Sequence, residues 1–210
     1  MINRDKFGKA LSEGKMEEVK ELIQKALNGG ESPERILKEG LITAMDQIGV
    51  RFKNNEIYIP EVLIAARAMH AGLGVLKPIL AKSTTDASAK IVLGTVKGDL
   101  HDIGKNLVGM MLEGGGFEVV DIGIDAPPEK FIQTAKEHGA KIIGMSALLT
   151  TTMMQMKTTV GMVRAGGMGV KMIVGGAPVT AEFARQIGAD GYAADAASAV
   201  SKVKELLGMT

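Results

Sequence analysis

From about residue 90 onward, short apolar runs alternate with stretches of helical periodicity. Five apolar runs are visible, at 91–96, 118–122, 142–146, 172–174 and, more weakly, 191–193. Helical stretches separate or follow them, near 104–114, 128–138, 153–165, 180–187 and 196–207. Parallel strands need a long crossover connection, which a helix usually supplies. The alternation therefore predicts βαβ units and a parallel sheet with helices on both faces.

Five strands and five helices in about 120 residues restrict the topology further. They predict an α/β domain over residues 90–210, with a flavodoxin-like, doubly wound sheet of five parallel strands in the order 2-1-3-4-5. In such a sheet, ligands bind outside the carboxyl ends of the strands, at the switch point between strands 1 and 3. The residues that follow strands 1, 3 and 4 are therefore candidates for a site.

Residues 1–82 have a different rhythm, with helical periodicity and no visible strand. Apolar residues recur at three- and four-residue spacing in 17–27, and Asn28-Gly29-Gly30 ends that helix. Further helices are predicted around 5–12, from Ser32-Pro33 onward and from Pro60 onward. We expect a four-helix bundle here. A small, polar linker at 83–89 would join it to the α/β domain.

The composition narrows the class of protein. The chain is 46% hydrophobic, with 25 basic and 24 acidic residues and a net charge of +1. It holds two Tyr, five Phe, no Trp and no Cys. We therefore expect no nucleic-acid or membrane-surface partner, no disulfide and no thiolate site. A polar N-terminus and the lack of an apolar run of about 18 residues lead us to expect no signal peptide, no membrane span and a cytoplasmic location.

His101 is the most unusual residue after the first predicted strand. Asp99 precedes it by two residues, and Asp102 follows it directly. A histidine that gives one ring nitrogen to a carboxylate can present the other nitrogen to a metal or a proton. A surface loop with Asp102 as a helix cap explains the same residues without any site, and it stays open as an alternative.

Two more segments fall on the same predicted edge of the sheet. The run from Ser146 to Thr152 follows strand 3, and Gly175-Gly176 follows strand 4. Each has a plain structural alternative, which is a helix N-cap for the threonine run and a tight turn for the glycine pair. Their convergence with His101 on one edge favours a functional site over three unrelated loops.

The same edge lacks the sequence motifs with which other proteins of this fold bind their ligands or carry out their chemistry. The glycines after strand 1 do not have the spacing of a dinucleotide-binding motif. The segment from Gly98 to Lys105 is one residue too long for a P-loop, and Asn106 stands where a hydroxyl would hold magnesium. Strand 3 ends in Ser146 and not in the phosphoacceptor Asp of a receiver domain. A zinc hydrolase would need more ligands than His101 has near it in sequence.

Taken together, these residues resemble the cobalamin-binding signature of corrinoid proteins and of the B12-binding domains of methionine synthase and some mutases. The match is Asp99-x-His101-x-x-Gly104, then 41 residues, Ser146-x-Leu148, then 26 residues, and Gly175-Gly176. Residues 1–82 look like the helical cap domain that precedes this domain in methyl-transferring members. A chain of only these two domains is similar to the stand-alone corrinoid proteins of anaerobic methyltransferase systems, which serve methylamines, methanol, methoxy-aromatics or betaines.

The resemblance implies a cofactor and roles for individual residues. The cofactor would be cobalamin or another cobamide, in its methylcobalamin, cob(I)alamin, cob(II)alamin or hydroxocobalamin form. It would bind base-off, with its lower base in a slot of the α/β domain. His101 would be the ligand below cobalt, Asp99 would bind its other ring nitrogen, and Thr152 would complete a relay where methionine synthase has a serine.

The same resemblance implies a wider set of binding residues. Ser146 would contact the lower base, and Gly175-Gly176 would line the tail of the cofactor, where a Cβ would intrude. The full implied set is Gly98, Asp99, Leu100, His101, Asp102, Ile103, Gly104, Ser146, Leu148, Leu149, Thr150, Gly175, Gly176 and Ala193.

The resemblance also implies a methyl carrier that is not a complete enzyme, because no part of the chain remains to activate a methylated substrate. It would accept a methyl group through a substrate:corrinoid methyltransferase and deliver it to a second methyltransferase that acts on coenzyme M or tetrahydrofolate. A reductive activase would be a further partner. A cobalamin-dependent sensor is the alternative, although no helix-turn-helix segment supports it. A mutase small subunit comes third, because the methyl-type cap argues against it.

Overall fold

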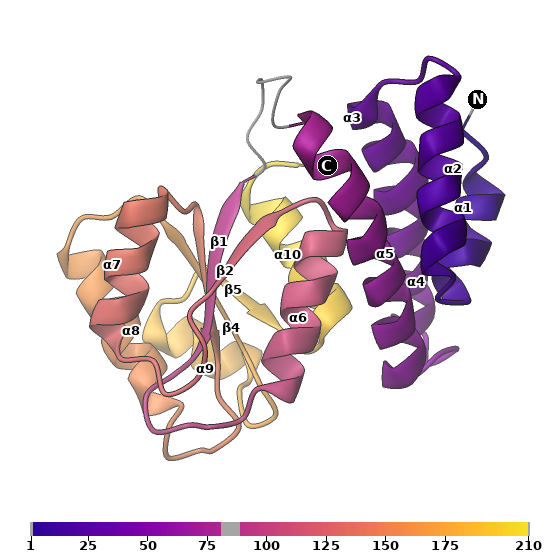
Figure 1. Cartoon of the computed structure of the whole chain (residues 1–210). Helices are drawn as coiled ribbons and strands as arrows, with labels where there is room; N and C mark the ends of the chain where they lie inside the picture. The colour runs from indigo at the N-terminus through magenta and orange to yellow at the C-terminus, as the bar shows by residue number, and fades with distance from the viewer. Residues whose placement is uncertain (1, 81–88, 210) are drawn as a thin grey trace. The chain divides into compact units, whose positions relative to one another are not determined.

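The computed structural model describes residues 2–80 and 89–209, which form two compact units (Figure 1). One unit holds the described part of residues 1–88 together with 113–116. The other holds residues 89–112 and the described part of 117–210. The predicted linker at 83–89 lies, apart from Ala89, outside the described residues.

The N-terminal unit is helical, as predicted. Its helices are α1 (Arg4–Ser12), α2 (Met16–Asn28), α3 (Pro33–Arg35), η1 (Ile36–Ile42), α4 (Thr43–Lys53) and α5 (Ile59–Leu80). Asn3 and Ser32 cap the first turns of α1 and α3, where their side chains accept hydrogen bonds from backbone N–H groups. Helices this short depend on tertiary packing for most of their stability. The packing here is a core of Phe7, Leu11, Val19, Ile23, Leu41, Met45 and Met69.

A π-helical segment interrupts the third predicted helix. This segment is η1, and Gly40 lies within it. A Cβ at Gly40 would approach the ring of Phe7 to 3.2 Å, so the glycine lets α1 pack close to this turn. The spacing of apolar residues from Ser32-Pro33 onward predicts an ordinary α-helix. It does not reveal the π-helical segment, because one wide turn changes the spacing of apolar residues only a little.

The long helix α5 contains a long apolar segment, although the sequence was expected to hold no apolar run of about 18 residues. Its segment Ile59–Leu76 has a mean hydropathy of 1.4, which is enough by length and composition to cross a membrane. In the structure, however, Val62, Ala66 and Met69 are buried, and α5 packs against α1, α2 and α4. It is the core helix of the N-terminal unit, and the core helices of soluble proteins have this composition.

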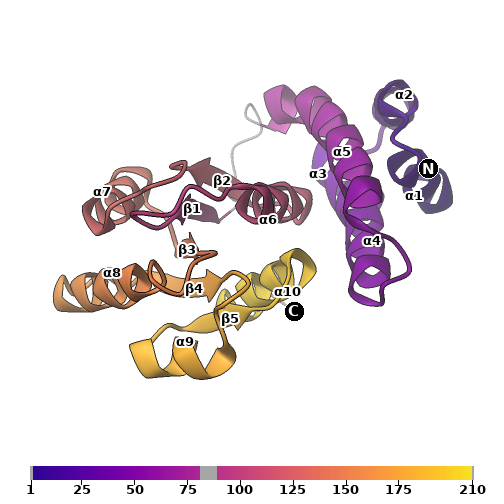
Figure 2. The same cartoon turned by 90° about the horizontal axis from the view of Figure 1, so that it is seen from below.

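The C-terminal unit is a five-stranded parallel sheet in the order β2-β1-β3-β4-β5, which confirms the predicted topology. Its strands are β1 (Lys90–Thr95), β2 (Glu118–Asp121), β3 (Ile142–Ser146), β4 (Lys171–Gly175) and β5 (Gly191–Ala193). Its helices are α6 (Ile103–Gly114), α7 (Pro128–His138), α8 (Met154–Ala165), α9 (Ala181–Ile187) and α10 (Ala196–Leu206). Helices α7, α8 and α9 cover one face of the sheet, and α6 and α10 cover the other (Figures 1 and 2). The central strands are therefore buried on both sides.

The strand register brings four residues into one row. Thr95 pairs with Ser146, Ser146 with Gly175, and Gly175 with Ala193. These are the last residues of β1, β3, β4 and β5, so the loops that follow begin at the same height. The carboxyl ends of the strands point downward in Figure 1. Every segment that the sequence singles out for a site emerges from this row.

Candidate functional site

The loop between β1 and α6 carries Asp99 and His101. Asp99 Oδ1 lies 2.8 Å from His101 Nδ1 and also accepts a 3.1 Å hydrogen bond from the backbone N–H of His101. The side chain of Asp99 is fully buried, whereas that of His101 is 52% exposed. An ionised carboxylate can only accept hydrogen bonds, so Nδ1 of His101 carries the proton. The lone pair of the neutral ring is then on Nε2.

The second oxygen of Asp99 is held by the loop after β3. Oδ2 accepts hydrogen bonds from Leu148 N at 2.8 Å, Leu149 N at 3.2 Å and Thr152 Oγ1 at 2.7 Å. Burial by itself raises the pKa of Asp99, but the hydrogen bonds from Thr152, Leu148 and His101 outweigh it and hold that pKa well below its usual range. Asp99 is therefore ionised at neutral pH. The structure thus joins Asp99, His101 and Thr152 in one hydrogen-bonded chain, while their roles toward a cofactor stay predictions.

Asp125, in the loop after β2, is a residue that sequence reasoning missed. Its Oδ1 accepts a 2.7 Å hydrogen bond from Gly98 N, and its own N–H donates to the carbonyl oxygen of Asp99 at 3.0 Å. Asp125 has a φ of 50° and Gly98 a φ of 83°, a region that aspartate tolerates and glycine favours. The turn-forming sequence Gly123-Ile124-Asp125 after a predicted strand is the signal that could have pointed to it.

Lys105 is buried in the first turn of α6. Its ammonium group donates to Asp121, the last residue of β2, and to Asn106 Oδ1 at 2.7 Å. Asn106 in turn donates from Nδ2 to Asp102 Oδ2 at 3.1 Å. A buried ammonium group is tolerated only with such partners. This network anchors Asp102, the neighbour of His101, to the end of β2.

Large apolar side chains are exposed on the loops that carry this network. Leu100 and Ile103 are 68% and 75% exposed, and Leu148 and Leu149 are each 42% exposed. Exposed apolar side chains gathered in this way mark a surface that a ligand or partner covers. Gly104 is also exposed, and a Cβ there would meet no atom within 4 Å. Among the residues that the structure describes, no contact therefore requires glycine at this position.

The structure explains the glycines at Gly175 and Gly176 by contacts within the protein, whereas the expectation was that a Cβ would intrude on the cofactor. Gly176 has a φ of 128°, and a Cβ there would lie 1.9 Å from the carbonyl oxygen of Ala147. A Cβ at Gly175 would lie 2.9 Å from the carbonyl oxygen of Ala193. The protein backbone therefore excludes a side chain here by itself. Of the remaining predicted residues, Ser146 is half-buried at the end of β3, and Thr150 is exposed.

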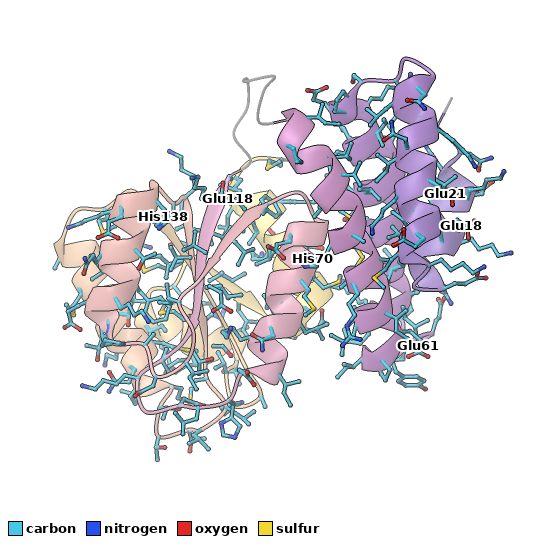
Figure 3. The ribbon with its side chains drawn as sticks, in the orientation of Figure 1. Glu18, Glu21, Glu61, His70, Glu118 and His138 are labelled. Atoms are coloured by element: carbon cyan, nitrogen blue, oxygen red, sulfur yellow. The ribbon has the colours of Figure 1, made fainter. Side chains whose placement is uncertain are left out.

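The other two histidines lie away from this network. His138 is the last residue of α7, at the edge where β2 begins with Glu118 (Figure 3). That edge is opposite to the one that carries His101. His70 belongs to α5, in the helical unit. Within residues 2–80 and 89–209, no three His, Cys, Asp or Glu side chains form a metal cluster.

Known proteins match both halves of the chain. A family model described as "B12 binding domain" matches residues 89–201, and a second model with the same description matches residues 4–77. The dimethylamine corrinoid protein of Methanosarcina barkeri is 43% identical over 196 residues, which is 92% of this chain and 92% of that protein.

Two solved structures share the architecture over nearly the whole chain. A cobalamin-binding protein from Desulfitobacterium hafniense aligns with a TM-score of 0.82 and 32% identity, covering 98% of this chain and 99% of its own. The methanol:cobalamin methyltransferase complex MtaBC from Methanosarcina barkeri contains a chain that aligns with a TM-score of 0.86 and 29% identity. That alignment covers 98% of this chain and 79% of the other.

Proposed function

Because this chain belongs to the corrinoid protein family, we propose that it is a methyl carrier that works between two methyltransferases and is not a complete enzyme. Its cofactor is a cobamide. When bound, the cobamide supplies a cobalt ion that can accept and release a methyl group. The observation that carries the proposal is the Asp99–His101 pair, which presents Nε2 of His101 at the ligand-binding edge of the sheet.

His101 is the residue we assign as the ligand below cobalt. Asp99 holds the proton on Nδ1, which fixes the tautomer and makes Nε2 more basic and a better ligand. The side chain of His101 is half exposed, so a bound cofactor could reach Nε2. The carboxylate of Asp99, itself held by Thr152, would keep the ring in this orientation for the cofactor.

The surrounding residues fit a large macrocycle. We assign Leu100, Ile103, Leu148 and Leu149 to contact its apolar face, since they are exposed on the loops that flank His101. Covering them would also remove their apolar surface from water. Gly98, Asp102 and Thr150 belong to the same loops, and Gly104 lies in the first turn of α6. Ser146, Gly175, Gly176 and Ala193, at the ends of their strands, would meet the nucleotide part of the cofactor.

Methylamines are the methyl source we propose, because the relative from Methanosarcina barkeri is named for dimethylamine. The partners would be a substrate:corrinoid methyltransferase, a second methyltransferase acting on coenzyme M or tetrahydrofolate, and a reductive activase. All of these reactions would take place in the cytoplasm. Nothing in the described residues looks able to activate an amine, so the choice of methyl donor would lie in the first partner.

A methyl-transfer assay tests the proposed donor. It needs the first methyltransferase, purified from the organism that makes this protein by its binding to this chain. The chain loaded with hydroxocobalamin and reduced would be mixed with that partner and with dimethylamine, trimethylamine, methanol or betaine in turn. We expect the visible spectrum to change with a methylamine, and the methyl group to pass on when the second methyltransferase and coenzyme M or tetrahydrofolate are added. His101→Ala should bind cobamide with an altered cobalt(III) spectrum. A response to methanol or betaine alone would overturn the proposed donor, and an unchanged spectrum in His101→Ala would remove His101 from cobalt.

A further inference from the structure

Thr95 is a buried polar residue that the proposed function does not use. It is the last residue of β1, and its side chain has no exposed surface. Its backbone N–H donates to the carbonyl oxygen of Gly123, and its own carbonyl oxygen accepts from Ala126 N, both at 2.9 Å. These bonds fix the main chain of Thr95 against the loop after β2. Its hydroxyl group makes a different contact, a 2.8 Å hydrogen bond to the carbonyl oxygen of His101.

That contact completes a three-point hold on His101. The backbone N–H and ring Nδ1 of His101 both bind Asp99 Oδ1, at 3.1 and 2.8 Å. The carbonyl oxygen accepts the hydrogen bond from the Thr95 hydroxyl. Between the two anchors the chain turns sharply, with Gly98 at a φ of 83° and a hydrogen bond of 3.1 Å from Asp99 N to the carbonyl oxygen of Val96. Asp99 therefore sets the amino side of His101, and Thr95 sets its carbonyl side.

We propose that Thr95 is a positioning residue, whose hydroxyl fixes the peptide plane after His101 and thereby the direction in which Nε2 points. The inference rests on the proposed role of His101 as the ligand below cobalt. A ring held only through Asp99 could still swing with the main chain. The hydrogen bond to the rigid end of β1 removes that freedom. A metal ligand is most effective when its supporting contacts hold it in place before the metal binds.

The structure offers a clean substitution and a matched control. Thr95→Val keeps the shape of the side chain and removes only the hydroxyl, and Thr95→Ser keeps the hydroxyl. Thr159, in α8, is equally buried and its hydroxyl binds the carbonyl oxygen of Gln155 at 2.9 Å. Thr159→Val therefore removes the same kind of hydrogen bond far along the chain from His101. Water can reach the exposed loop of His101, so Thr95→Val should fold.

The first measurement needs no cofactor. In apoprotein labelled with ¹⁵N-histidine there are only three imidazole rings, and His101→Gln identifies the signals of His101. In Thr95→Val, the Nδ1 proton of His101 should exchange with solvent about fivefold faster than in wild type, the factor expected from loss of one ordinary hydrogen bond. Thr95→Ser should restore the wild-type rate, and Thr159→Val should leave it unchanged.

The second measurement uses the protein loaded with hydroxocobalamin and reduced to cobalt(II). Electron paramagnetic resonance should show coupling to the labelled histidine nitrogen in wild type, Thr95→Ser and Thr159→Val, and a reduced coupled fraction in Thr95→Val. Equal exchange rates in folded Thr95→Val and wild type, or an equal disturbance in Thr159→Val, would overturn the positioning role. Absence of histidine coupling in the wild type would overturn the ligand role, and the exchange rates would still decide the hold of Thr95 on His101.

Discussion

Asp99 and Thr152 lie 53 positions apart, yet the Thr152 hydroxyl donates a 2.7 Å hydrogen bond to Asp99 Oδ2. The contact runs from the loop after β1 to the loop after β3. These strands pair in register up to Thr95 and Ser146, so their loops start side by side. The carboxylate that orients His101 is therefore held by the neighbouring strand's loop, and its geometry depends on the sheet itself.

Thr152→Val should destabilise the apoprotein by about 1–3 kcal/mol, because it removes a hydrogen bond from a carboxylate that is fully buried. Thr152→Ser keeps the hydroxyl and should lie close to wild type. Urea unfolding of the three proteins measures the difference. If Thr152→Val and Thr152→Ser are equally stable, the hydroxyl does not support Asp99 in solution.

Periodicity was enough to predict the sheet and its edge. The five strands and their order follow from apolar runs and crossovers, and the register then places Ser146 and Gly175 beside the loop of His101. The Asp99–His101 contact is local in sequence, which is why proximity along the chain suggested it.

The residues that support this pair could not be predicted in the same way. Asp125 and Thr95 reach it through loop conformations, and a buried threonine at the end of a strand looks like any other strand residue. The reason for Gly176 was also hidden, because it depends on how closely the loops after β3 and β4 approach. The π-helical turn at η1 left no trace in the periodicity.

Asp190 should make the stability of the C-terminal unit depend on pH. Burial by itself raises the pKa of Asp190, but hydrogen bonds from Met172 N at 2.8 Å and from Arg164 at 2.9 Å, with Lys171 nearby, outweigh it and lower that pKa below its usual value. A carboxyl group with a lowered pKa stabilises the fold above its unfolded pKa of about 3.9 and loses that effect as the pH falls through its folded pKa.

Asp190→Asn should therefore be less stable than wild type at neutral pH, and the gap should narrow below about pH 4. Urea unfolding followed by circular dichroism between neutral and acid pH measures both curves. A gap that stays constant over this range would mean that the charge of Asp190 contributes nothing and that only its shape matters.

Gly176→Ala should destabilise the fold by about 3 kcal/mol or more, since its φ of 128° strains any other residue and its Cβ would collide with the backbone of Ala147. Gly169→Ala is the control, because a Cβ at this glycine, which lies before β4, meets no atom within 4 Å. Thermal unfolding of the apoproteins separates the two. A mild effect at Gly176 would show that the close approach of the two loops relaxes in solution.

Gly104→Ala should have the opposite signature, a stable apoprotein with weakened cofactor binding. Gly104 is the second residue of α6, and a Cβ there meets no protein atom within 4 Å. Alanine is favoured over glycine within a helix by about 0.5–1 kcal/mol, so the apoprotein should be at least as stable as wild type. If the cobamide covers this residue, the added methyl group occupies space that the cofactor needs, and affinity should fall about tenfold.

Urea unfolding of the apoprotein and spectrophotometric titration with hydroxocobalamin measure the two effects of Gly104→Ala separately. Gly161→Ala is the matched control, because Gly161 is a helical glycine of α8 with no atom within 4 Å of an added Cβ. It should share any gain in stability and bind cobamide as the wild type does. Equal affinity in Gly104→Ala and Gly161→Ala would mean that the cofactor does not lie against the first turn of α6, and the assignment of Gly104 to the site would be wrong.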